Sequence, residues 1–101
     1  MASYTTIEDW QAVEDEYVAD VTIRRTTDEE YPCGWDYSFH FGKTDGTTIL
    51  RYDNAHERSK GHERHTAEEV EAIEFPGLLP LYDRFTREAE AISSVSWDWP
   101  M

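Results

Sequence analysis

Residues 51–65 read RYDNAHERSKGHERH and bring together side chains that could cleave a phosphodiester bond. Three histidines lie in this segment, His56, His62 and His65. Imidazoles titrate near neutral pH and can give or take a proton, as cleavage of RNA through its 2′-hydroxyl requires. Cations stabilise the charge that develops on the phosphate oxygens. The cations of the segment are Arg51, Arg58, Lys60 and Arg64.

Specific roles follow from these residue types. We predict that His62 and His65 share the acid and base work of a ribonuclease that needs no metal and no cofactor. Asp53 is predicted to orient a histidine or hold an arginine, and Tyr52 to donate a proton or stack on a base. Gly61 allows a close backbone approach. The predicted phosphate contacts come from Arg51, Arg58, Lys60 and Arg64.

Plainer interpretations remain open for the same residues. Histidines in a polar segment are often ordinary surface residues, and His56, His62 and His65 form at best a weak metal-binding pattern. Tyr52 is as well suited to the core as to catalysis, because it shares a strand face with Leu50. Elsewhere, His40 is expected to be a polar strand residue without a function.

Charge sets this segment apart from the rest of the chain. The chain has 22 acidic and 9 basic residues, and a formal net charge of −13. Residues 51–65 alone carry a net +1, from four bases and three acids. The acidic residues are scattered, which indicates a surface adapted to molar salt. A chain of this charge repels nucleic acid and anionic membranes at low salt.

The 101 residues predict a single domain over positions 1–101. No stretch approaches the roughly 18 apolar residues of a membrane span, and no basic-then-apolar leader opens the chain. We therefore expect a cytoplasmic protein. The lone Cys33 excludes an internal disulfide and is expected to be structural.

The elements that position these residues are predicted to form a small α+β domain. Strict alternation over 35–41 predicts a strand with an aromatic inner face, and 17–25 and 47–53 also alternate. The Asp45-Gly46 step predicts a hairpin between the last two. An antiparallel meander of three to four strands results.

Helices are predicted at both ends of the chain. Apolar residues at 7, 10 and 13 favour a weak helix over 7–16, and the spacing over 78–92 predicts an amphipathic helix that covers the aromatic face. Residues 54–66 are expected to be a polar loop. Residues 70–75 could add a fourth strand, or begin a helix if Thr66 and Glu69 form a capping box.

The Tyr52–His56 motif YDNAH and the later His62–His65 motif HERH together resemble the TumE-like family of small toxins. The resemblance covers residues 47–92 well and the earlier strands by pattern only. It implies a toxin neutralised by a cognate antitoxin, with RNA as the expected substrate, and the acidic composition resembles that of haloarchaeal proteins. Glu63 departs from the family pattern, which often has adjacent histidines or a basic residue between two histidines.

A second class of function remains open beside the enzyme. The chain could be a non-enzymatic interaction module that binds a protein partner. Its contact surface would then be the basic segment or the C-terminal tail, which contains Trp97 and Trp99.

Overall fold

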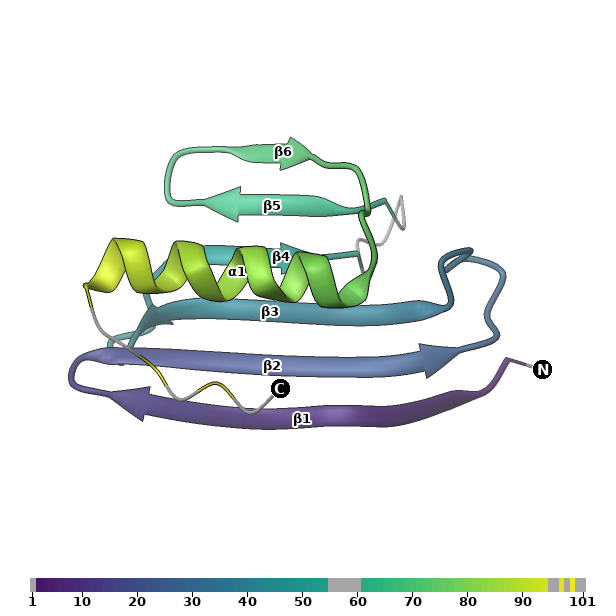
Figure 1. Ribbon diagram of the computed structural model, residues 1–101, viewed down its shortest axis with the longest axis horizontal. Helices are drawn as coiled ribbons and strands as arrows, with labels where there is room; N and C mark the ends of the chain where they lie inside the picture. Colours follow the sequence, from purple (N-terminus) through teal and green to yellow (C-terminus); the bar gives the residue numbers. More distant parts are fainter. Residues whose placement is uncertain (1, 55–60, 95–96, 98, 100–101) are drawn as a thin grey trace.

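A computed structural model describes residues 2–54 and 61–94 together with Trp97 and Trp99 (Figure 1). The described chain forms six strands followed by one helix. Their bounds are β1 Tyr4–Glu14, β2 Tyr17–Thr26, β3 Trp35–Lys43, β4 Thr48–Asp53, β5 Glu63–Thr66, β6 Val70–Ala72 and α1 Leu78–Ser93.

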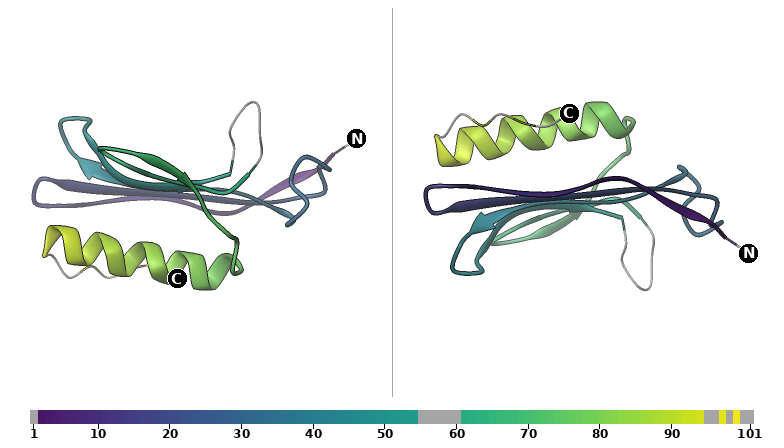
Figure 2. Two further views of the ribbon diagram at one scale, coloured as in Figure 1. Left: turned by 90° about the horizontal axis from the view of Figure 1, so that it is seen from above. Right: turned by 90° about the horizontal axis from the view of Figure 1, so that it is seen from below.

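The strands form one antiparallel sheet in the order β1-β2-β3-β4-β5-β6, so every neighbour in space is also the neighbour in sequence. The helix α1 lies against one face of this sheet (Figure 2). We call the opposite face the open face, because no described helix covers it. The predicted α+β class, antiparallel meander and C-terminal helix are confirmed.

The core lies between the sheet and α1. Tyr37, Phe39 and Phe41 of β3 are at most 1% exposed, as the alternation over 35–41 predicted. Phe85 of α1 packs on Phe39 with ring centroids 5.5 Å apart. This aromatic contact buries one face of the sheet and leaves the polar residues of β3 on the open face.

The helix predicted over residues 7–16 is wrong, because this segment is β1. Of the three apolar residues that suggested a helix, only Trp10 packs against the core, while Ile7 and Val13 are 51% and 57% exposed. The chain turns at Asp15, which has a φ of 53°, and Glu14 then pairs with Tyr17. Ten pairs with β2 outweigh the weak helical spacing.

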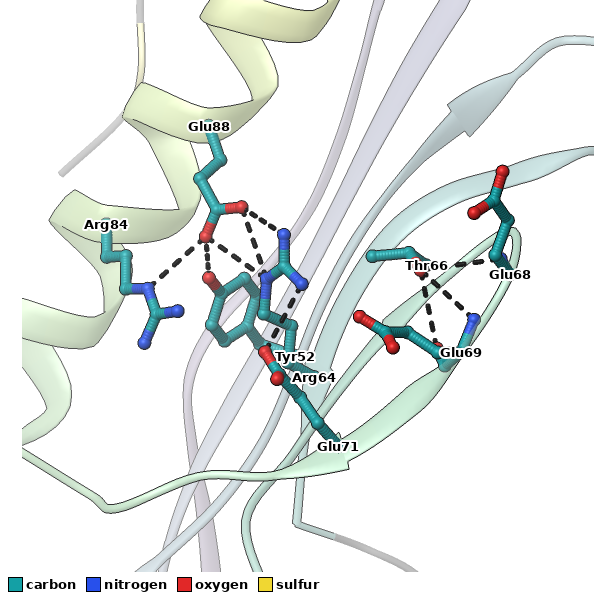
Figure 3. Close-up of polar contacts among 8 residues, drawn as sticks. All are labelled: Tyr52, Arg64, Thr66, Glu68, Glu69, Glu71, Arg84 and Glu88. Carbon is teal, nitrogen blue, oxygen red and sulfur yellow. Dashed lines mark hydrogen bonds and ion pairs between the residues drawn. The ribbon is translucent and has the colours of Figure 1, made fainter.

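The expectation of three or four strands was also too low, because residues 54–66 contain β5 and are not all loop. β5 and β6 form a hairpin. Of the two alternatives predicted for residues 70–75, a strand or the start of a helix, β6 confirms the strand. The Thr66 hydroxyl accepts hydrogen bonds from the backbone of Glu69 and Glu68 at 3.2 and 3.4 Å (Figure 3). The capping pattern therefore closes this hairpin and begins no helix.

The helix predicted over 78–92 is confirmed, with Pro80 in its first turn. Gly77 precedes it with a φ of 114°, a backbone conformation that residues other than glycine rarely adopt. In the tail, Trp97 is 9% exposed and Trp99 packs against the core. These two rings are therefore covered by the protein itself. Among the described residues, no helix has the length and apolar character needed to cross a membrane.

Candidate active site

The register of β4 and β5 divides the predicted site residues between the two faces of the sheet. Arg51 pairs with His65, Tyr52 with Arg64, and Asp53 with Glu63. Because side chains alternate along a strand, the first and third pairs share one face and the middle pair lies on the other. Tyr52 is fully buried under α1, so the pairs that contain His65 and Asp53 lie on the open face.

A histidine, an arginine and a second histidine lie side by side on the open face. His40 of β3 pairs with Arg51 of β4, and Arg51 pairs with His65 of β5. Side chains directly opposite each other on neighbouring strands lie about 5 Å apart at Cβ. His40 and His65 therefore flank Arg51, whose side chain is 45% exposed.

Carboxylates surround this row. The Nε atom of Arg51 lies 2.7 Å from Oδ2 of Asp53, whose side chain is only 9% exposed. The Nε2 atom of His65 lies 3.5 Å from Oδ1 of Asp53 and 3.5 Å from Oε1 of Glu63. Asp53 thus contacts both the guanidinium of Arg51 and the imidazole of His65.

His40 is held by contacts on both ring nitrogens. Its Nε2 lies 2.9 Å from the Thr48 hydroxyl, and its Nδ1 lies 3.7 Å from Oδ2 of Asp20. Burial lowers the pKa of His40 below the ordinary histidine value, against the opposing effect of Asp20. The imidazole is therefore neutral at pH 7 and able to accept a proton.

Tyr52 and Arg64 belong to a different cluster, which links the sheet to α1 (Figure 3). The Tyr52 hydroxyl donates to Oε1 of Glu88, and Nη2 of Arg64 lies 2.6 Å from Oε2 of Glu88. Glu71 lies 3.3 Å from Nη1 of the same guanidinium. Both ends of Arg64 are thus occupied by carboxylates, which is the arrangement of a structural ion pair.

Glu88 is the acceptor at the centre of this helix-side cluster. Nε of Arg84 also approaches its Oε1 at 3.3 Å, and the Arg84 guanidinium lies 5.5 Å from the centre of the Tyr52 ring. Burial raises the pKa of the Glu88 carboxyl. The arginines therefore offset the cost of holding this charge at the boundary between helix and sheet.

His62 also lies on the helix side and is packed among aromatic rings. Its ring stacks on Phe75 with centroids 4.4 Å apart, and its Nδ1 lies 2.7 Å from the Tyr37 hydroxyl. Burial lowers the pKa of His62 and raises that of Tyr37. The tyrosine therefore keeps its proton, and its hydroxyl shares a hydrogen bond with a neutral imidazole.

The structure divides six of the predicted site residues into two separate groups. Arg51, Asp53 and His65 share the open face, whereas His62 lies on the other side of the sheet with Tyr52 and Arg64. His62 and His65 therefore lie on opposite sides of the sheet. The predicted residues His56, Arg58 and Lys60 lie outside the described residues.

Among the residues of these groups to which sequence reasoning gave no role are His40, Glu63 and Glu88. His40 had a usable signal, because it alternates with the aromatic residues of β3 and so had to lie on the opposite face. Glu63 and His65 stand two apart, the spacing of one strand face. Neither Arg64 nor any nearby residue indicates Glu88, which comes from a helix 24 positions later.

Comparison with known proteins gives one informative result. No curated protein and no solved structure matches the chain. A protein-family model described as Toxin TumE matches residues 4–93, from the first residue of β1 to the last residue of α1. This chain therefore belongs to the Toxin TumE family.

Proposed function

We propose that the protein is the toxin of a toxin–antitoxin pair and that it inhibits growth by cleaving RNA in the cytoplasm without a metal. Membership of a toxin family supports the first part and implies a cognate antitoxin. The observation that carries the second part is the row of His40, Arg51 and His65 on the open face. It combines two titrating groups with a partly exposed cation.

The row suits the two proton transfers of RNA cleavage. His40, neutral at pH 7 because burial lowers its pKa, takes the proton of the 2′-hydroxyl. Arg51 contacts the phosphate oxygens from between the two rings and stabilises the charge of the pentacoordinate transition state. His65 donates a proton to the leaving 5′-oxygen.

The carboxylates give this row its geometry. Asp53 holds the guanidinium of Arg51 at 2.7 Å, and Asp20 lies 3.7 Å from His40. Fixed partners of this kind reduce the reorganisation that a catalytic side chain undergoes during the reaction. The phosphate contacts of Arg58 and Lys60, and any part of His62, Arg64 or Tyr52 in catalysis, stay predictions of the sequence.

The test is RNA cleavage by the purified protein in molar salt with EDTA, together with growth inhibition on expression with and without the neighbouring gene. We expect His40→Gln and His65→Gln each to lower cleavage by about 100-fold or more. Arg51→Gln should lower it as well, while Arg87→Gln, which removes an arginine exposed on α1, should leave it unchanged.

Two results would overturn the proposal. One is the absence of any RNA cleavage by a folded protein that is toxic in cells. The other is full cleavage by folded His40→Gln and His65→Gln variants, with loss in His62→Gln. The second result would return the chemistry to the helix side of the sheet.

A further inference from the structure

Two polar atoms on the open face are buried without a hydrogen-bond partner among the described residues. They are Oε1 of Glu63 and Nε2 of His65. The two atoms lie 3.5 Å apart, and no hydrogen bond joins them. Buried polar atoms in folded proteins almost always have a hydrogen-bond partner or a bound ion, so two such atoms side by side indicate a missing partner.

The third atom at this point is Oδ1 of Asp53. It lies 3.5 Å from Nε2 of His65, and all three atoms fall within 4.8 Å of one another. The other oxygen of Asp53 is engaged by Arg51, which leaves Oδ1 directed at the histidine. One nitrogen and two carboxylate oxygens therefore converge on one point.

The separations fit a metal ion better than a hydrogen-bond network. In a tetrahedral zinc site with bonds of about 2.1 Å, neighbouring ligand atoms lie about 3.4 Å apart. The two distances of 3.5 Å from His65 match this edge length, and the two carboxylate oxygens lie within 4.8 Å of each other. An octahedral magnesium ion would need closer to about 3.0 Å and favours oxygen ligands over imidazole.

The local charge also favours a cation. Asp53 and Glu63 supply two negative charges and Arg51 one positive charge, which leaves one negative charge when His65 is neutral. The side chains of Glu63 and His65 are 25% and 26% exposed, while their two unpartnered atoms are buried.

We propose that Asp53, Glu63 and His65 bind one zinc ion or a similar divalent transition-metal ion. Binding places the ion on Nε2 of His65, so this nitrogen cannot carry a proton while the ion is bound. If His65 donates a proton as the proposed function states, a bound ion therefore inhibits RNA cleavage. This consequence rests on the proposed function, whereas the binding of the ion does not.

The test measures zinc binding without RNA. Protein purified without an affinity tag and stripped with EDTA is titrated with zinc against a chromophoric chelator. We expect each chain to bind one zinc ion, and we expect this binding to require Asp53, Glu63 and His65. Glu63→Gln and His65→Gln should each weaken binding by at least about tenfold. His62→Gln, a histidine on the other side of the sheet, should bind zinc as the unchanged protein does.

A second measurement separates loss of a ligand from loss of the fold. Zinc should raise the Tm of the unchanged protein and of His62→Gln, but not of Glu63→Gln. Absence of zinc binding to the unchanged protein, or unchanged affinity in folded Glu63→Gln and His65→Gln, would overturn the proposal. Cleavage in EDTA reports on the ribonuclease alone, so the two proposals fail separately.

Discussion

Removal of the Arg64–Glu88 ion pair should destabilise the protein by an amount that can be worked from its contacts. Three nitrogen–oxygen contacts of 2.6, 3.2 and 3.4 Å join the two side chains, which are 18% and 24% exposed. Breaking a fully buried pair costs about 3–5 kcal/mol, and an exposed pair contributes under about 1 kcal/mol. This pair is intermediate, so we expect Arg64→Gln to lower the free energy of unfolding by about 2 kcal/mol.

A double-mutant cycle isolates the pair from its neighbours. Arg64→Gln, Glu88→Gln and the double variant are unfolded in urea at low salt and followed by tryptophan fluorescence. The coupling energy should be about 1–1.5 kcal/mol. The matched control is Asp83 with Arg87, an ion pair on α1 whose side chains are 60% and 79% exposed. Its coupling should stay below about 0.5 kcal/mol.

Equal coupling in the two cycles would refute the reasoning. The helix-side cluster would then contribute no more than a solvent-exposed pair, and Arg64 would be free for the substrate contact that its sequence position predicts. A variant Arg64→Gln that keeps its stability and loses RNA cleavage would point to the same conclusion.

Three further predictions concern stability. The side chain of Asn54 is fully buried, accepts a hydrogen bond from the backbone of Tyr37 at 3.0 Å and donates one to the carbonyl of Trp35 at 2.7 Å. Asn54→Ala should therefore lower the free energy of unfolding, measured in urea, by about 2–4 kcal/mol. A decrease below about 1 kcal/mol would contradict this prediction. Burial lowers the pKa of His62, so the free energy of unfolding should be highest above about pH 6.5 and should decrease as the pH falls through the lowered pKa. The decrease should be smaller in His62→Gln, and the same dependence of stability on pH in both proteins would contradict this prediction. Molar salt should raise the Tm, because residues 1–20 carry six acids and no base and the chain has a net charge of −13; an unchanged Tm would remove the salt-adapted interpretation.

The three consecutive residues Tyr52, Asp53 and Asn54 acquire a structural explanation from these contacts. Tyr52 bonds to Glu88 of α1, Asp53 contacts Arg51 and His65 on the open face, and Asn54 bonds to two backbone groups of β3. Three consecutive residues thus join β4 to the helix, to the candidate active site and to the neighbouring strand. A motif of this kind can reflect folding and catalysis together.

The sequence alone determined the parts of the fold whose periodicity is strong. Alternation over residues 35–41 predicted β3 and its buried aromatic face, and three- and four-residue spacing predicted α1. These signals are reliable because burial of one face of a strand or helix is recorded in the same short stretch that forms it. The toxin family was also recognisable from the residues between 47 and 92.

Tertiary structure alone decided the strands with weak patterns and the composition of the site. Residues 4–14 form β1 because β2 pairs with them, although their own spacing favoured a helix. The pairing of β4 with β5 places His65 on the open face, opposite the side on which His62 meets Tyr37, and the pairing of β3 with β4 places His40 beside Arg51. Strand register depends on contacts between distant segments, and a shift of one residue exchanges the two faces. A list of nearby histidines therefore could not show which of them act together.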